Sequence, residues 1–339
     1  MKKFRRILAV LAIAMFTFTA CSVEGQDKND NASSNAKEET KAKDGEYKIG
    51  VSLSTLNNPF FVSIREGVEE AAKDANAKTI ITDAQNDSST QNNQVEDLIT
   101  QKVDLIIINP VDSTAISTSV KKANEANIPV ICVDRNSDEG EIVSLIASNN
   151  VEGGKLAGEF ILEKIGENAE VIQLEGIPGA SSTRERGEGF KKATDGKINL
   201  LASQTANFDR AEGMTVMENL LQAQPDVKAV FCQNDEMALG AIEAIKASGK
   251  DIVVVGFDGN EDAINAVKEG SMSATVAQKP KEMGKIALET AIKYLKGEKV
   301  EDIDTGAVWY NAENIDSKEV KSLPVSYTHL RAHETAANL

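Results

Sequence analysis

The chain of 339 residues has only two histidines, His329 and His333, and both lie in its last eleven residues. The rest of the chain therefore has no imidazole to act as a general base or to bind a metal ion. This argues against Ser–His or Cys–His nucleophilic catalysis and His-based metal sites, and we expect no metal and no cofactor. Cysteine is scarce too: Cys132 and Cys232 each lie in an apolar run, which favours single buried thiols over a disulfide.

Positive charge is also in short supply. Lys and Arg number 37 against 53 Asp and Glu, which gives a formal net charge of −16. So acidic a chain lacks the basic surface that binds a phosphate backbone, and nucleic acid is therefore not an expected partner. The length of 339 residues suits about two domains, and a content of 41% hydrophobic and 27% charged residues is that of a globular protein.

Long apolar runs are missing except for residues 7–18, which follow four basic residues. This run is shorter than the ~20 residues that span a bilayer. Residues 1–20 are therefore predicted to be an export signal rather than a membrane helix, which places the protein outside the cytoplasm.

The end of this signal, FTAC at residues 18–21, is similar to a bacterial lipobox. The similarity predicts cleavage before Cys21 and attachment of lipid to it. Phe18 departs from the pattern, in which Leu is usual, and the alternative is an ordinary secretory signal. Residues 21–45 are polar and are predicted to be a flexible tether. We thus expect a protein that is lipid-anchored to the cell membrane or located in the periplasm.

From Tyr47 onward, short apolar runs rich in β-branched residues alternate with stretches of helical spacing. The first half contains YKIGVSL, TIIT, DLIIINP and PVICVD, and the second half contains AEVIQLEG, VKAVFCQN and DIVVVGFD. Such alternation predicts an α/β protein with parallel sheets covered by helices on both faces. Because LIIINPVDSTAI is echoed by AVFCQNDEMALGAI, we expect two doubly wound lobes whose strand-end loops line a cleft.

The predicted strand ends carry aromatic, amide and charged residues. Asn58 and Phe60 follow the first strand, Asp134-Arg135 another, and Arg184 and Arg186 lie in SSTRERGEGF. Further strand ends carry Phe208, Asn234, Phe257-Asp258 and Gln278. Sugars stack their C–H faces on aromatic rings and offer hydroxyls to fixed donors and acceptors. The set therefore indicates a carbohydrate site, although each residue alone is compatible with a core or surface position.

With these motifs the chain resembles the periplasmic ribose-binding proteins of the type I solute-binding family, which serve ABC sugar importers. The resemblance covers Tyr47 to about Gly306 and rests on STLNNPFFVS, INPVDS, NIPVICVDR, STRERGEGF, NFDR, QNDEMALGA and VVVGFDG. It implies two lobes joined by a three-strand hinge that close on one sugar. The implied ligand residues are Ser54, Asn58, Phe60, Phe61, Asp134, Arg135, Arg184, Phe208, Asn234, Phe257, Asp258 and Gln278.

Within this set Phe60 and Phe208 would sandwich the sugar ring, with Phe61 and Phe257 as further apolar walls. The charged and amide groups would satisfy the hydroxyls. Both statements are implied by the resemblance.

The resemblance also implies domain boundaries. One lobe would comprise 46–148 and 279–306 and the other 149–278 and 307–322, with hinge crossings near Ser148, Gln278 and Gly306. Residues 323–339 are unlike the family, and we expect them to be foreign sequence; the alternative is a divergent tail.

The expected ligand is D-ribose. The chain has no Asp-x-Asn-x-Asp-like calcium loop, and its one tryptophan, Trp309, is away from the strand-end residues, which disfavours galactose and glucose. Allose, a psicose-like sugar and a furanosyl signal molecule stay open. The expected partners are an ABC transporter permease and, on the same closed face, a chemoreceptor; a monomer is expected.

Other classes of function fit less well. A glycosidase could use Asp134 and Asp258, but their Arg and amide neighbours are expected to keep both ionised, whereas one catalytic carboxyl must be protonated. A sugar-responsive repressor would need a DNA-binding segment where the export signal lies. GGKLAG at 153–158 lacks the spacing of a dinucleotide-binding loop. We therefore expect a binding protein and not an enzyme.

Overall fold

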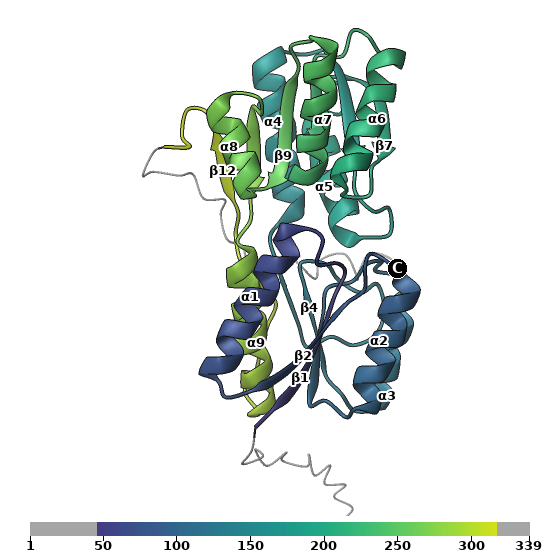
Figure 1. The fold of residues 1–339 in the computed structure, drawn as a ribbon, viewed down its shortest axis with the longest axis vertical. Coiled ribbons are helices and arrows are strands. Elements are labelled where there is room, and N and C mark those ends of the chain that lie inside the picture. The colour runs from purple at the N-terminus through teal and green to yellow at the C-terminus, as the bar shows by residue number, and fades with distance from the viewer. Residues whose placement is uncertain (1–45, 317–339) are drawn as a thin grey trace, which may run out of the picture. The chain divides into compact units, whose positions relative to one another are not determined.

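A computed structural model of the chain describes residues 46–316, which form two α/β lobes (Figure 1). The first lobe has a sheet of strand order β11-β5-β4-β3-β1-β2, in which all pairings are parallel. Its strands are β1 (Lys48–Leu53), β2 (Lys78–Asp83), β3 (Leu105–Ile108), β4 (Val130–Val133), β5 (Ser144–Ala147) and β11 (Ile303–Asp304). Its helices are α1 (Pro59–Asp74), α2 (Ser88–Thr100), α3 (Ser117–Glu125) and α9 (Pro280–Leu295).

The second lobe repeats this plan, with strand order β12-β10-β9-β8-β6-β7. Its strands are β6 (Glu170–Glu175), β7 (Asn199–Thr205), β8 (Ala229–Cys232), β9 (Val253–Asp258), β10 (Ala274–Ala277) and β12 (Val308–Asn311). Its helices are α4 (Asn150–Ile165), α5 (Ser181–Thr194), α6 (Arg210–Ala223), α7 (Asp235–Ser248) and α8 (Glu261–Glu269). The predicted fold class is confirmed, with one exception to the parallel pattern: the edge strand β12 pairs antiparallel with β10.

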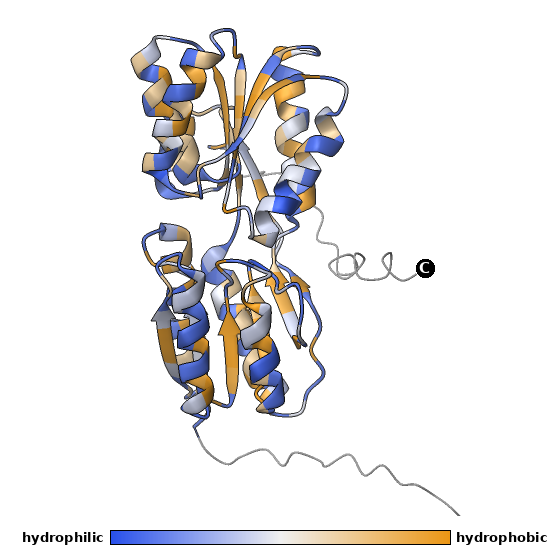
Figure 2. Ribbon diagram, turned by 90° about the vertical axis from the view of Figure 1, so that its right-hand side faces the viewer, coloured by the Kyte–Doolittle hydropathy of each residue, from blue (hydrophilic) through white to orange (hydrophobic). Residues whose placement is uncertain are grey.

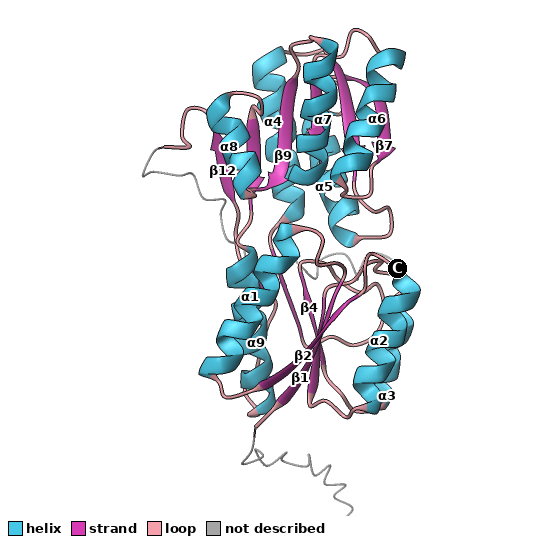
Figure 3. Ribbon diagram, viewed as in Figure 1, coloured by secondary structure: helices cyan, strands magenta, loops and turns pink. Residues whose placement is uncertain are grey.

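The strands are apolar because each sheet is covered by helices on both faces, as the ribbon coloured by secondary structure shows (Figure 3). In the hydropathy view the strands are largely orange, whereas the helices carry blue residues on their outer sides (Figure 2). The four residues of β3 and the four of β8 are all buried. This burial explains why their sequences are continuous apolar runs and do not alternate with polar residues.

Paired glycines let α4 and α5 pack closely. A Cβ atom on Gly154 would lie 2.1 Å from the carbonyl oxygen of Arg186, and one on Gly189 would lie 1.9 Å from that of Val151. Only glycine permits this approach of two helix backbones. The contact fixes the position of the α5 backbone at Arg186, a residue of the site described below.

The strand orders place the functional loops. In each sheet the order reverses beside the first strand, between β1 and β3 in one lobe and between β6 and β8 in the other. Ligands of such sheets bind outside the carboxyl ends of the strands near this point. The residues that follow β1, β4, β7, β8 and β9 lie at those ends.

The chain crosses between the lobes three times. Hydrogen bonds join these crossing segments to one another and to a strand end. The hydroxyl of Ser148 donates to the carbonyl oxygen of Gly306 at 3.0 Å. The backbone N–H of Gln278 donates to the carbonyl oxygen of Asp258 at 2.8 Å. The domain boundaries drawn from the sequence stay a prediction.

Several expectations concern residues outside the described range: the export signal of 1–20, the lipidation of Cys21, the tether and the foreign tail of 323–339. Within 46–316, no helix is both long and apolar enough to cross a membrane. In the same range Cys132 and Cys232 are buried, unpaired thiols, and burial raises the pKa of Cys132 to about 12.

Candidate functional site

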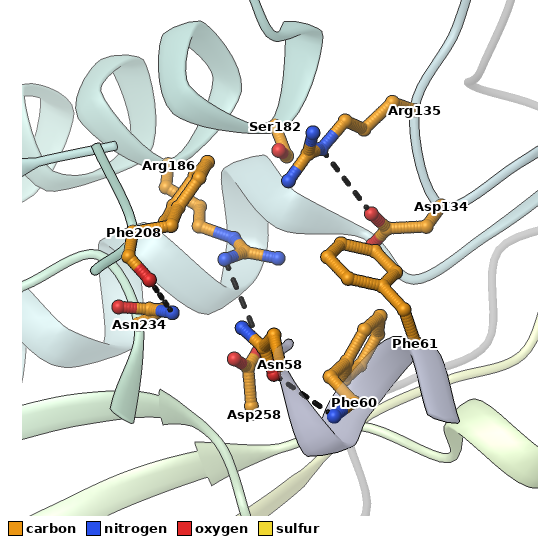
Figure 4. A pocket seen from close by; sticks show the side chains of 10 residues that line it. All are labelled: Asn58, Phe60, Phe61, Asp134, Arg135, Ser182, Arg186, Phe208, Asn234 and Asp258. Atoms are coloured by element: carbon orange, nitrogen blue, oxygen red, sulfur yellow. Dashed lines mark hydrogen bonds and ion pairs between the residues drawn. The ribbon is translucent and has the colours of Figure 1, made fainter. Parts of the chain in front are cut away.

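A pocket lies between the strand ends of the two lobes (Figure 4). The space among its lining atoms amounts to about 220 Å³, part of which is open to solvent. The first lobe contributes Asn58, Phe60, Phe61, Asp134 and Arg135, and the second contributes Ser182, Arg186, Phe208, Asn234 and Asp258. Because both lobes supply walls, a ligand here contacts the two at once.

The loop after β1 supplies an amide and two rings. Asn58 is the N-cap of α1, and its side-chain oxygen accepts a hydrogen bond from the Phe60 N–H at 2.9 Å. The capping bond uses one of the two lone pairs of the oxygen, so the whole Nδ2 group and one lone pair are left for a ligand. The rings of Phe60 and Phe61 meet edge to face, with centroids 5.3 Å apart, and both are buried.

The end of β4 supplies an ion pair. The Arg135 Nε lies 3.5 Å from Asp134 Oδ2, and the Arg135 Nη1 donates to the carbonyl oxygen of Pro110 at 3.0 Å. The guanidinium carbon lies 5.1 Å from the ring centroid of Phe61 and 5.1 Å from that of Phe208. One buried cation therefore contacts an aromatic ring in each lobe.

A second cation enters from α5. The Arg186 guanidinium carbon lies 3.8 Å from the centroid of the Phe257 ring. Its Nε donates to Asn150 Oδ1 at 2.9 Å, and its Nη1 donates to the carbonyl oxygen of Gln233 at 2.7 Å. Nη1 is also 3.8 Å from Asp258 Oδ1. Stacking and these hydrogen bonds hold the fork in one orientation at the pocket wall.

Three pocket residues have unusual backbone conformations. Asp134 has φ +64°, Phe208 has φ +59° and Asp258 has φ +125°. Positive φ is costly for residues other than glycine, above all for a bulky one such as Phe208. Such strain concentrates at functional sites, where the surrounding structure imposes it. Around Phe208, the Asn234 Nδ2 donates to its carbonyl oxygen at 3.3 Å.

Several buried polar atoms at the pocket have no hydrogen-bond partner among the described residues: Asp134 Oδ1, Arg135 Nε and Ser182 Oγ. Buried polar groups are nearly always paired, so each such atom requires an explanation. The Arg135 Nε faces Asp134 Oδ2 as part of their ion pair, whereas the unpaired carboxylate oxygen and the serine hydroxyl are suited to a ligand that carries hydroxyl groups.

The charges of the pocket balance. Arg135 and Arg186 face Asp134 and Asp258, so the fixed charges sum to zero when both carboxyls are ionised. Burial raises the pKa of Asp258 to about 7, against the opposing effect of Arg186 and of the hydrogen bond from Gln278. Our expectation that its neighbours keep Asp258 fully ionised is therefore wrong: the cost of removing the charge from water exceeds their effect.

Four of the predicted ligand residues do not line the pocket. Ser54 is buried beneath it and donates its backbone N–H to Asn109 Oδ1 at 3.2 Å. Phe257 stacks under Arg186, and the Gln278 Nε2 donates to Asp258 Oδ1 at 2.9 Å. Arg184 is about half exposed and pairs with Asp138. The role of these four as ligands stays a prediction, and the geometry favours a supporting role for them.

The sequence reasoning missed Ser182 as a pocket residue and took Arg184 where Arg186 lines the wall. A signal was present, because Ser182 and Arg186 are four residues apart and share one face of a helix, whereas Arg184 is on another. Asn109 was missed as well. Its Nδ2 donates to Asp134 Oδ2 at 3.2 Å and to the carbonyl oxygen of Val133 at 3.1 Å, and so positions the carboxylate.

Comparison with known families decides the class of protein. Residues 49–299 match the model of the periplasmic binding protein domain. The chain belongs to the periplasmic binding protein family. Membership places it among exported binding proteins, not enzymes. The N-terminal export signal itself stays a prediction.

Relatives of this periplasmic binding protein cover most of its length. The ribose import binding protein RbsB of Bacillus subtilis (strain 168) is 52% identical over 297 residues, which are 88% of this chain and 95% of that protein. The ribose import binding protein RbsB of Escherichia coli (strain K12) is 52% identical over 255 residues, 75% of this chain and 86% of that protein.

Solved structures give the same result. An ABC transporter solute binding protein from Bacillus halodurans C-125 with bound myo-inositol has a TM-score of 0.77 at 35% identity and covers 81% of this chain and 98% of its own. A periplasmic solute binding protein from Actinobacillus succinogenes 130z with bound D-allose has a TM-score of 0.74 at 32% identity, with coverage of 80% and 99%.

Proposed function

We propose that this protein captures D-ribose in the pocket between its lobes and delivers it to the membrane permease of an ABC importer. The observation that carries the proposal is the pocket, which two buried Arg–Asp pairs and aromatic rings from both lobes surround. The identity of 52% to two ribose import binding proteins supports ribose as the sugar.

The proposed contacts divide the sugar into faces and edges. Phe60, Phe61 and Phe208 provide rings for the C–H faces. The carboxylates of Asp134 and Asp258 accept hydrogen bonds from hydroxyls, and the two Arg forks donate to them. We assign the second fork to Arg186 in place of Arg184.

Loading is coupled to closure. A sugar that touches both lobes stabilises only the arrangement in which the lobes are together. The permease can then distinguish the loaded from the empty protein by shape.

The test is calorimetric titration of the protein with ribose, allose, apiose, myo-inositol and arabinose. Ribose is expected to bind tightest. D-allose is the second candidate, because the D-allose-binding periplasmic protein of Escherichia coli (strain K12) is 34% identical over 270 residues. If allose binds more tightly than ribose, allose is the ligand and ribose is not. If no sugar binds, the proposal is refuted.

We also propose that Cys21 carries lipid, which keeps the protein beside the permease. The support is the FTAC motif and the polar stretch of 21–45. Growth with radioactive palmitate should label the protein, and the Cys21→Ser variant should lose both the label and its membrane association. If the parent protein is not labelled, Cys21 carries no lipid and the N-terminal segment is an ordinary secretory signal.

A monomer is proposed because large exposed apolar side chains are few and scattered in the described residues: Leu200 on β7, Met214 on α6 and Tyr294 on α9. Sedimentation should give one species of the chain mass.

We further propose that the closed face serves a chemoreceptor. Cells that lack the protein should then lose attraction to ribose, whereas cells that lack only the permease should keep it.

A further inference from the structure

Ser182 combines burial with an unused hydroxyl. It is the second residue of α5, and 1% of its surface is exposed. Its Oγ has no hydrogen-bond partner within residues 46–316, although the residue lines the pocket. In Figure 4 the Ser182 side chain points into the pocket, on the side where the Arg135 guanidinium lies.

Hydrogen bonds hold the first residues of α5 in place, and they therefore fix the backbone position of Ser182. The Ser181 N–H donates to the Ser113 Oγ at 3.1 Å, and the Asn136 N–H donates to the Ser181 Oγ at 2.9 Å. One turn later, Arg186 is locked by its stacking on Phe257. Ser182 and Arg186 therefore face the pocket together from one rigid helix face.

The three consecutive hydroxyls of α5 differ in what they face. That of Ser181 bonds to the opposite lobe, as described. That of Thr183 is buried without a partner in the described part of the chain, but Thr183 does not line the pocket. Only Ser182 combines an unpaired hydroxyl with a place in the wall, and Thr183 is a matched neighbour without that place.

We infer that Ser182 is a specificity-determining residue, whose hydroxyl binds one particular hydroxyl of the sugar. This inference rests on the proposed function. A sugar hydroxyl can donate one hydrogen bond and accept two, whereas Arg only donates and an ionised carboxylate only accepts. The serine hydroxyl can donate or accept. It can therefore make the hydrogen bond that a sugar hydroxyl still lacks when Arg135 only donates to it or Asp134 only accepts from it. A sugar without that hydroxyl leaves the buried Ser182 unpaired and binds more weakly.

The experiment is a set of double-mutant cycles between protein and sugar. The parent and Ser182→Ala are titrated with D-ribose, with its 2-deoxy, 3-deoxy, 4-deoxy and 5-deoxy analogues, and with its anhydro analogue that lacks the 1-hydroxyl. Ser182→Ala is expected to bind ribose about 2- to 13-fold more weakly, the range for one neutral hydrogen bond. For one analogue, Ser182→Ala should bind as tightly as the parent. The hydroxyl that this analogue lacks is the one that Ser182 binds.

Thr183→Val is the control, since it removes a buried hydroxyl from the same turn at nearly constant volume. It should leave the affinities and their order unchanged. Thermal unfolding checks that both variants are folded.

The inference is overturned if Ser182→Ala binds every sugar as the parent does, or if its loss is the same for all analogues. These results are distinct from failure of the proposed function, in which the parent itself would not bind ribose. If the parent binds allose instead, the same cycles with allose and its deoxy analogues decide the role of Ser182.

Discussion

Arg184 and Asp138 form an ion pair across the two lobes, with Arg184 Nη2 2.6 Å from Asp138 Oδ1. The hydroxyl of Thr114 donates to the other carboxylate oxygen at 2.5 Å, and the Arg184 Nη1 donates to the carbonyl oxygen of Gly179 at 3.1 Å. These residues do not line the pocket. The pair therefore joins the two lobes at a place outside the pocket.

Replacing Arg184 by Ala should weaken ribose binding by no more than about fivefold. The side chains of Arg184 and Asp138 are 46% and 33% exposed, and such pairs are worth about 0.2–1 kcal/mol. Because salt screens exposed charges, the difference between parent and variant should shrink as ionic strength rises. Calorimetry in low and high salt measures both effects. A loss of a hundredfold would show that Arg184 binds the sugar directly.

Replacing Arg186 by Ala should weaken binding at least tenfold. Arg186 is buried in the pocket wall, and a charge-assisted hydrogen bond contributes about 1.5–3 kcal/mol. Arg186→Lys keeps the charge but not the planar fork, so its affinity should be intermediate. Titration of the two variants beside Arg184→Ala tests which arginine of STRERGEGF serves the site. Unchanged affinity in Arg186→Ala would refute the assignment.

Replacing Ser113 by Ala should weaken binding of every sugar by the same factor. The Ser113 Oγ accepts the Ser181 N–H from the other lobe, and its loss leaves that N–H unpaired only when the lobes are together. An unpaired buried group costs about 1–3 kcal/mol, or about 5- to 150-fold.

The control is Ser117→Ala, because the Ser117 hydroxyl donates to the Ser113 carbonyl oxygen and accepts from the Glu139 N–H, all in one lobe. It should lower the midpoint of thermal unfolding more than the affinity. Small-angle scattering should show more open protein in Ser113→Ala alone; equal scattering of the two variants would contradict the role in closure.

Lowering the pH through about 7 should weaken ribose binding. Burial raises the pKa of Asp258 to about 7, with Asp134 and Glu236 raising it further and Arg186 and Gln278 lowering it. The ionised form accepts hydrogen bonds from two hydroxyls, and the protonated form loses part of that capacity. Titration between pH 5 and 9 measures the effect, and Asp258→Asn should give a flatter profile.

Stability should change with pH in the opposite direction. The pKa of Asp258 lies above its ordinary value of 3.8, so the folded state binds this proton more tightly than the unfolded state. Its contribution to the free energy of unfolding is therefore greatest at low pH and declines as the pH rises from about 4 through 7. Urea unfolding of parent and Asp258→Asn without sugar isolates this contribution; a difference that grows with falling pH would be inconsistent with the raised pKa.

Much of the fold was predictable because its signals are local. The apolar runs around Ile106, Ile131 and Val254 are continuous because both faces of each sheet are covered, and helical spacing intervenes between them. The short strands β11 and β12 had no such pattern. Their places depend on pairing with β5 and β10, residues far away in the chain.

The site was predictable to the level of the motif. Asn58, Phe60, Phe61, Asp134, Arg135, Phe208, Asn234 and Asp258 follow strand ends in the sequence and line the pocket in the structure. Their assignment as ligands is a proposal that the titrations will test.

The sequence by itself determined the architecture and the family, because hydrophobic periodicity and motif residues act over a few neighbours at a time. Only the tertiary structure decided which side chain of a motif lines the pocket. Arg184 and Arg186 are two residues apart, but the turn of α5 directs one to Asp138 and the other to Phe257. The same packing left Ser182 facing the pocket and raised the pKa of Asp258, since burial depends on what the rest of the chain brings around each group.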